Sequence, residues 1–210
     1  MNHSNAVRVD RTKWSREELF SFFSHAPLPF YSISFTVDVT RVVDFSHKNK
    51  VSFYLSLIHL ATRALNSVEN FRYTIRNGEV WLLDERHPSY TDMHRGSDVF
   101  HIVTPGWNES LLSFIRDSAS LSESQHCFID LDREADDLFY VSCLPSLRMT
   151  AITSKHSDPD DCVPALTWGA YEDHGGRKEL CMTLEVNHRF IDGIHVSMFA
   201  RKLDELIAEL

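Results

Sequence analysis

Apolar residues recur along the chain with two periods, one typical of helices and one typical of strands. Ser52–Val68 and Gly193–Leu210 repeat them at helical spacing, which predicts two amphipathic helices. Phe30–Thr40 alternates and is rich in β-branched and aromatic residues, which predicts a strand. Further helices are predicted at Trp14–Ser24, Arg41–Lys48 and Glu109–Leu121, and further strands at Ala6–Asp10, Ser89–Met93, Asp98–Val103, Leu138–Leu144, Arg148–Thr153, Thr167–Glu172 and Leu180–His188.

The order of these elements indicates the fold class. Phe71–Ile75 and Glu79–Leu83 flank Arg76-Asn77-Gly78, and Asn-Gly between two β-prone runs predicts a tight hairpin. Strands and helices do not alternate strictly, so we expect a mixed β-sheet with helices packed against it, an α+β two-layer sandwich rather than a doubly wound parallel sheet. We found no internal repeat or linker, and residues 1–210 are expected to form a single domain.

Composition narrows the classes of partner. The 210 residues carry a formal net charge of −9 without a Lys/Arg-rich run, which argues against nucleic-acid binding. The most apolar stretch, Val51–Leu65, contains Ser52, His59 and Arg63, so it predicts a buried helix rather than a membrane span. The four cysteines form no C-x-x-C pair and no signal peptide is apparent, so we expect reduced thiols and a cytoplasmic location. Neither G-x-G-x-x-G nor a P-loop motif occurs, so a nucleotide-like ligand would be held without a glycine-rich loop.

The junction between the last strand and the last helix is the most promising place for chemistry. Alternation places Met182, Leu184, Val186 and His188 on one face of the strand, and Asp192 directly precedes the helix. Three interpretations compete for this segment. His188 could be a buried, hydrogen-bonded histidine beside a helix cap, one ligand of a metal site with Asp192 and His195, or a general base. The strand pattern up to His188 disfavours the metal site, because the three side chains share a face only on a helix.

Four motifs along the chain suggest a function for this segment. His188-x-x-x-Asp192-Gly193 resembles the H-x-x-x-D-G signature of CoA-dependent acyltransferases. Three further runs, Trp14-Ser15-Arg16-Glu17-Glu18-Leu19-Phe20, Ser142-Cys143-Leu144-Pro145 and Pro164-Ala165-Leu166-Thr167 leading to Tyr171, are similar to motifs of the chloramphenicol acetyltransferase family. Together they resemble that family over nearly the whole chain.

The resemblance implies a direct acetyl transfer from acetyl-CoA to a hydroxyl of chloramphenicol or a related small acceptor. His188 would be the general base. Ser142 would donate a hydrogen bond to the tetrahedral oxyanion, and Thr167 would help through a water. No metal would be required. The protein would be a homotrimer with active sites at the subunit interfaces, and acetyl-CoA would be a co-substrate bound along a tunnel.

The resemblance also assigns supporting roles. Asp192 would turn away from His188 and form an ion pair with Arg16, and the backbone carbonyl of His188 would set the tautomer of its own ring. Phe23 and Phe100 would contact the acceptor, whereas Tyr171 would lie near CoA.

Three positions depart from the family pattern, and two other functions remain open. Asn187 stands where a second histidine is common, Phe23 where a tyrosine is common and Ser146 where a tryptophan is common. The missing hydroxyl at residue 23 puts chloramphenicol itself in question as the acceptor. The run from Asn187 to Gly193 is also similar to the D-H-R-x-x-D-G of dihydrolipoamide acyltransferase cores, although residues 1–186 contain no Ala/Pro-rich linker of the kind that such cores usually follow. The other alternative is a catalytically degenerate trimer that binds a small ligand.

Overall fold

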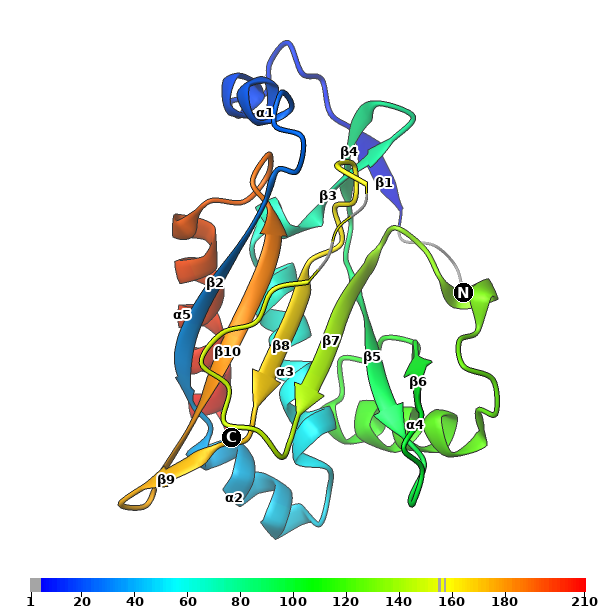
Figure 1. The fold of residues 1–210 in the computed structure, drawn as a ribbon, viewed down its shortest axis with the longest axis vertical. Coiled ribbons are helices and arrows are strands. Elements are labelled where there is room, and N and C mark those ends of the chain that lie inside the picture. The colour runs from blue at the N-terminus through cyan, green and yellow to red at the C-terminus, as the bar shows by residue number, and fades with distance from the viewer. Residues whose placement is uncertain (1–4, 155, 157) are drawn as a thin grey trace.

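Within residues 5–154, 156 and 158–210, which the computed structural model describes, a seven-stranded mixed sheet forms the centre of the protein and a three-stranded sheet lies at one end (Figure 1). The strands are β1 (Ala6–Arg8), β2 (Phe30–Asp38), β3 (Tyr73–Arg76), β4 (Glu79–Leu83), β5 (His87–Met93), β6 (Phe100–Val103), β7 (Leu138–Leu144), β8 (Ala165–Gly169), β9 (Glu172–His174) and β10 (Arg177–Asn187). The helices are α1 (Glu17–Phe23), α2 (Thr40–Asn49), α3 (Phe53–Asn66), α4 (Leu111–Ser124) and α5 (Gly193–Ala208), with short 3₁₀ turns η1 (Glu69–Arg72) and η2 (Leu131–Arg133).

The large sheet combines parallel and antiparallel pairs. Its order is β2-β10-β8-β7-β5-β6, and β9 pairs with the start of β10. β7 runs parallel to both β5 and β8, whereas β10 is antiparallel to β8 and β2. This architecture confirms the mixed sheet with packed helices that the sequence predicts.

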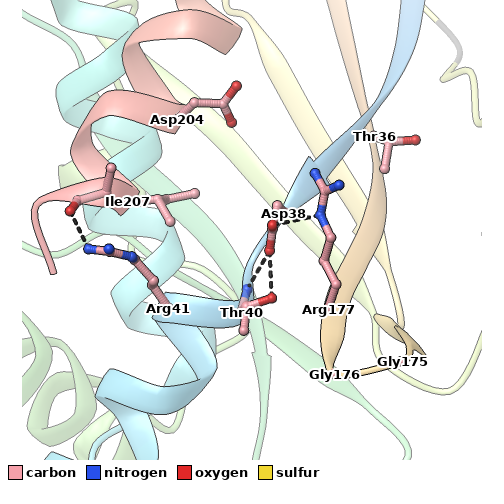
Figure 2. A pocket seen from close by; sticks show the side chains of 10 residues that line it. Thr36, Asp38, Thr40, Arg41, Gly175, Gly176, Arg177, Asp204 and Ile207 are labelled. Carbon is pink, nitrogen blue, oxygen red and sulfur yellow. Dashed lines mark hydrogen bonds and ion pairs between the residues drawn. The ribbon is translucent and has the colours of Figure 1, made fainter.

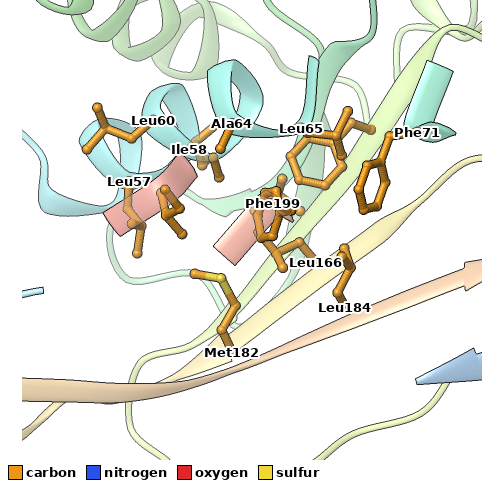
Figure 3. Packing of buried hydrophobic residues seen from close by; sticks show 14 of the residues in the cluster. Leu57, Ile58, Leu60, Ala64, Leu65, Phe71, Leu166, Met182, Leu184 and Phe199 are labelled. Atoms are coloured by element: carbon orange, nitrogen blue, oxygen red, sulfur yellow. The ribbon is translucent and has the colours of Figure 1, made fainter. Parts of the chain in front are cut away.

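One face of the sheet is covered by helices, and the opposite face, which we call the open face, carries no helix within the described residues. Figure 3 shows side chains of α3 and α5, among them Leu57 and Phe199, packed against Leu166 of β8 and Leu184 of β10. All four are fully buried, and apolar burial of this kind contributes about 1.5–3 kcal/mol for each large side chain. Because side chains alternate along a strand, the neighbours of these core residues face the open side.

The hairpin predicted at Asn77-Gly78 is present between β3 and β4. Asn77 has a φ of 54° and Gly78 a φ of 76°, the two positive values that a tight turn of the type I′ class requires. Several predicted boundaries shift by a few residues. The first helix starts at Glu17 rather than Trp14, and the strand expected at Thr167–Glu172 is instead Ala165–Gly169.

One predicted strand is wrong. Arg148–Thr153 has the residue types of a strand but forms none. It belongs to a long segment, residues 145–164, that connects β7 to β8 and that we call the strap. The strap approaches Gly169 so closely that a Cβ there would lie 2.6 Å from the Leu147 carbonyl oxygen. Backbone groups of the strap hydrogen-bond to side chains of β10, those of Glu185 and Asn187. These bonds take the place of pairing with the backbone of a neighbouring strand. No helix in the described part of the chain is long and apolar enough to cross a membrane.

Candidate active site

The turn that carries His188 links the end of β10 to the start of α5. The backbone N–H of His188 donates to the Pro29 carbonyl at 2.7 Å, which extends the β2–β10 pairing by one residue. The following four residues reverse the chain before α5 begins at Gly193. His188 is therefore fixed just beyond the last residue of β10, where the alternation of side chains along the strand no longer sets the direction of its ring.

Side chains from three other segments hold the carbonyl groups of this turn. Arg16 donates to the carbonyls of His188 and Arg189, at 3.1 and 2.8 Å. Asn70 donates to Phe190 at 2.8 Å, and the Tyr31 hydroxyl donates to Ile191 at 3.2 Å. Each of these bonds satisfies a carbonyl that the turn leaves without a backbone partner, so the turn has one well-defined conformation.

The ion pair expected between Arg16 and Asp192 is present. Two guanidinium nitrogens donate to the two carboxylate oxygens of Asp192, both at 2.6 Å, and Arg16 is buried. These hydrogen bonds hold the pKa of the Asp192 carboxyl below its usual range, against a smaller opposing effect of burial. Such a bidentate pair fixes both position and charge. It ties the residue before α1 to the turn before α5.

The imidazole of His188 lies between two aromatic rings. It stacks on Phe23 with ring centroids 4.1 Å apart and contacts Tyr31 at 4.4 Å. The side chain is 34% exposed, whereas Nδ1 is buried. The exposed part of the ring therefore carries Nε2, the nitrogen that could meet a substrate.

The surroundings of Nδ1 differ from the expectation. Asp192 does not turn away from the ring, because its Oδ1 lies 3.3 Å from Nδ1. The carbonyl of His188 accepts from Arg16, and no described group makes a well-aligned hydrogen bond with Nδ1. The nearby carboxylate nevertheless favours a proton on Nδ1, which would leave the lone pair on the exposed Nε2.

Tyr31 was not singled out from the sequence. Burial and the negative charge of Asp192 raise the pKa of its hydroxyl to about 12, so the phenol stays protonated and donates to Ile191. Only the register of β2 against β10, which pairs Tyr31 with Val186, brings it next to His188. The alternating pattern of Phe30–Thr40 alone predicts that Tyr31 is an ordinary strand residue.

The metal interpretation does not fit this donor set. Arg16 occupies both oxygens of Asp192, and Nδ1 of His195 accepts a hydrogen bond from the Asp192 N–H at 2.9 Å. Within the residues that the structure describes, no group of three His, Cys, Asp or Glu side chains is arranged to hold a metal ion.

Ser142 and Thr167 lie together on the open face of the sheet. They are register partners in the parallel pair β7–β8, and both are partly buried. The Ser142 hydroxyl is also 3.2 Å from the hydroxyl of Thr91 on β5, a residue that the sequence did not mark. Three hydroxyl groups from adjacent strands thus form a small polar cluster, which we call the hydroxyl cluster.

The hydroxyl cluster is far from His188 of the same chain. Thr167 pairs with Thr183 of β10, five positions before His188. At about 3.3 Å per residue, the separation along the strand is about 16 Å. Two groups this far apart cannot act on one reacting carbon.

The remaining predicted contacts lie elsewhere on the surface. Phe100 is partly exposed and packs edge-on against Phe128. Tyr171 is also partly exposed and packs against Phe53. No contact in the described structure joins either ring to His188.

Asn187, which departs from the family pattern, anchors the strap. Its amide nitrogen donates to the carbonyls of Pro159 and Asp161, both at 3.0 Å, while its oxygen accepts from the backbone and side chain of Arg189. A histidine could not make all four bonds. The structural role of Asn187 is therefore to hold the strap and Arg189, and its side chain makes none of these four bonds to His188.

Glu185 anchors a second part of the strap. Its buried carboxylate accepts hydrogen bonds from Ser32, Thr153, the Ser154 N–H and His156, the last at 2.5 Å. Burial alone would raise the pKa of this carboxyl, but the hydrogen bonds hold it below its usual value. The His156 ring also stacks on the ring of Phe30, with the two centroids 3.8 Å apart.

Two surface hollows lie at opposite ends of β2. The one in Figure 2, of about 670 Å³, is lined by Asp38, Arg177 and Asp204, with Arg177 donating to Asp38 at 2.8 Å. Asp38 is eight positions along β2 from Phe30, or about 26 Å away. The other hollow, of about 450 Å³, is lined by Phe30, Tyr31 and Glu185 among others. Tyr31 lines this second hollow and also contacts the ring of His188, whereas His188 itself lines neither of the two hollows.

Comparisons with known proteins agree with the motifs. The family model described as chloramphenicol acetyltransferase matches residues 3–204. A chloramphenicol acetyltransferase of Escherichia coli is 26% identical over 206 residues, which cover 96% of this chain and 93% of that protein. A solved chloramphenicol acetyltransferase structure superposes with a TM-score of 0.89 at 24% identity, covering 97% of this chain and all of the other. A dihydrolipoamide acetyltransferase of Azotobacter vinelandii is less similar, with a TM-score of 0.67 and 19% identity over 91% of this chain and 86% of that one.

Proposed function

Because the chain belongs to the chloramphenicol acetyltransferase family and is therefore an acyltransferase, we propose that it moves the acetyl group of acetyl-CoA to a hydroxyl of chloramphenicol or a related small acceptor. The observation that carries the proposal is the fixed position of His188. Its ring is held between Phe23 and Tyr31 with one buried and one exposed nitrogen. An imidazole held in this way is suited to general base catalysis.

The proposed reaction needs one base and one hydrogen-bond donor. Nε2 of His188 removes the proton of the acceptor hydroxyl as its oxygen attacks the thioester carbonyl. The C–O bond forms and a tetrahedral oxyanion results, which the Ser142 hydroxyl stabilises with help from Thr167 through a water. The C–S bond then breaks, and the CoA thiolate takes up the proton from the imidazolium. Acetylated acceptor and free CoA leave.

Two copies of the chain are required to assemble this set of groups. His188 and Ser142 of one chain are separated by about 16 Å along the strands, too far to share a substrate. In our proposal, His188 of one copy faces the hydroxyl cluster of a neighbouring copy in a symmetric homotrimer. The hydroxyl cluster supports this assembly, because Ser142, Thr167 and Thr91 are only partly buried within the chain.

The acceptor pocket is expected to be more apolar than one with a tyrosine at residue 23. Phe23 contacts the catalytic ring directly, so any acceptor that reaches His188 also meets Phe23. We propose an acceptor with an apolar or aromatic body next to its hydroxyl. An acceptor that needs a hydrogen bond from residue 23 would be used poorly.

A thiol-release assay tests the activity. Purified protein is incubated with acetyl-CoA and a panel of acceptors, with chloramphenicol first and dihydrolipoamide second, and free CoA is measured with a thiol reagent. We expect acceptor-dependent release with a hydroxyl acceptor, and mass spectrometry should find an added acetyl group on that acceptor. Turnover only with dihydrolipoamide would favour an acyltransferase-core function instead. Absence of release with every acceptor would favour a degenerate binding protein.

Mixing two inactive variants tests the shared site. His188→Ala and Ser142→Ala chains are co-expressed with different affinity tags, and mixed oligomers are isolated through both tags. Every mixed trimer has one interface in three that takes an intact His188 from one chain and an intact Ser142 from the other, so the isolated mixed oligomers should regain about a third of the wild-type activity. Each homogeneous variant is the matched control. No recovery in the mixed oligomers would show that both groups act within one chain.

A further inference from the structure

His195 occupies the first turn of α5 and bonds back to the residue before the helix. Its Nδ1 accepts a hydrogen bond from the backbone N–H of Asp192 at 2.9 Å, and its side chain is only 15% exposed. In a capping box, a Glu or Gln at the third helical position makes this reverse bond. A histidine in that role is unusual, because it can perform it only in one protonation state.

The bond sets the state of the imidazole. Nδ1 must carry a lone pair, so the ring must be neutral with its proton on Nε2. A protonated ring would point an N–H at the N–H of Asp192 and lose the bond. Burial, and then the positive charge of Arg16, lower the pKa of His195, while Asp192 opposes the shift. The groups around it thus favour the neutral form.

The charged groups that act on His195 also belong to the candidate active site. Arg16, from the segment before α1, and Asp192, from the turn, act on it through their charges. Asp192 lies 4.0 Å from its ring, and His188 lies 3.3 Å from the same carboxylate. Asp192 is held by Arg16 on its carboxylate and by His195 on its backbone. Loss of the second contact removes one of the bonds that position the residue whose carboxylate lies 3.3 Å from Nδ1 of His188.

From this arrangement we propose that His195 is a positioning residue that keeps the 188–192 turn in its reactive geometry only while its own ring is unprotonated. The proposal rests on the proposed function, with His188 as the base. It adds a cause of inactivation at low pH that lies outside the reacting groups, because protonation of His195 would release the turn.

Two substitutions separate the hydrogen bond from the size of the side chain. His195→Gln supplies an uncharged amide oxygen, the acceptor that capping boxes ordinarily use, whereas His195→Leu fills similar space without one. At pH 8 we expect His195→Gln to keep kcat/KM within about threefold of wild type, and His195→Leu to lose about tenfold to a hundredfold through misplacement of the base.

The pH profile of kcat/KM provides a readout that a merely structural residue would not change. At low pH the logarithmic profile of wild type should be steeper by about one than that of His195→Gln, because protonation of His195 inactivates and glutamine takes up no proton. Equal slopes in the two proteins would overturn the proposal, and so would equal losses in the Gln and Leu variants. Failure of His195→Gln to fold would also overturn it, because an acceptor is all that the position is said to require.

A stability measurement separates this proposal from the proposed function. A histidine whose pKa is lowered by folding contributes stability above its unfolded pKa of about 6.5, and this contribution is lost as the pH falls through that value toward the folded pKa. Urea unfolding at a series of pH values should therefore show wild type weakening relative to His195→Gln below about pH 6.5. This result needs no substrate. It would stand even if acetyl transfer were disproved, whereas a constant difference between the two proteins would refute the role of His195 alone.

Discussion

Replacing His188 with alanine is expected to lower kcat/KM for acetyl transfer by about 10²–10⁴-fold, the contribution of a well-placed general base. The substitution removes the ring that lies between Phe23 and Tyr31 and that has one nitrogen on its exposed side. The loss should fall mainly on kcat, because the proton is transferred in the transition state. Steady-state thiol release with the acceptor identified by the assay measures it.

The fold should survive this change. The ring of His188 is 34% exposed, and the turn is held through backbone carbonyls that alanine retains. Circular dichroism and the oligomeric state should therefore match wild type. His174→Ala, at an exposed histidine of β9, is the matched control and should keep full activity. Activity of His188→Ala within about threefold of wild type would contradict the assignment of the base.

The sequence predicts the frame of the site but only part of its lining. The alternation of β10 and the helical repeat of α5 place a turn at His188–Asp192, and the family motifs connect that turn to Arg16. Both follow from local pattern or from motif spacing. Tyr31 and Thr91 could not be found this way, because their places depend on the strands that pair with β10 and β7. Strand register across a mixed sheet is set by packing of the whole core rather than by the strand itself.

The strap shows why one strong local pattern fails. Arg148–Thr153 has strand propensity, yet the anchors of the strap are polar groups of the sheet. Glu185 accepts from Thr153 and the Ser154 N–H, and the Cys181 thiol donates to the Thr150 carbonyl. A single buried carboxylate in β10 thus competes successfully with a possible ladder. Propensity is a weak guide where tertiary hydrogen bonds decide the backbone path.

Arg86 is expected to have the largest single effect on stability. Its guanidinium is fully buried and donates to five backbone carbonyls, those of Phe71, Tyr73, Asp136, Leu138 and Cys162. These carbonyls belong to the η1–β3 region, to the start of β7 and to the end of the strap. One side chain therefore joins the small sheet to the large sheet and to the strap. Burial lowers the pKa of Arg86 to about 10, so it is still charged at neutral pH.

Arg86→Met keeps much of the volume but leaves five buried carbonyl groups without this donor. An unsatisfied buried polar group costs about 1–3 kcal/mol, so even with partial rearrangement we expect a loss of at least about 4 kcal/mol, a large part of the stability of a typical domain. Urea unfolding at one fixed protein concentration measures it, because the stability of an oligomer depends on concentration. Arg86→Lys should recover part of the loss, since an ammonium group offers three donors in place of five.

The matched control is Arg8→Met on β1. Arg8 is exposed, and its nearest carboxylate, Glu79, lies 3.9 Å away, so the substitution should change stability by less than about 0.5 kcal/mol. The difference between the two variants isolates the buried carbonyl network from the general effect of losing a positive charge in a chain of net charge −9. Equal unfolding midpoints for Arg86→Met and Arg8→Met would mean that water or other donors replace the guanidinium. The carbonyls would then not depend on Arg86, and its guanidinium would not be the group that joins the three parts of the fold.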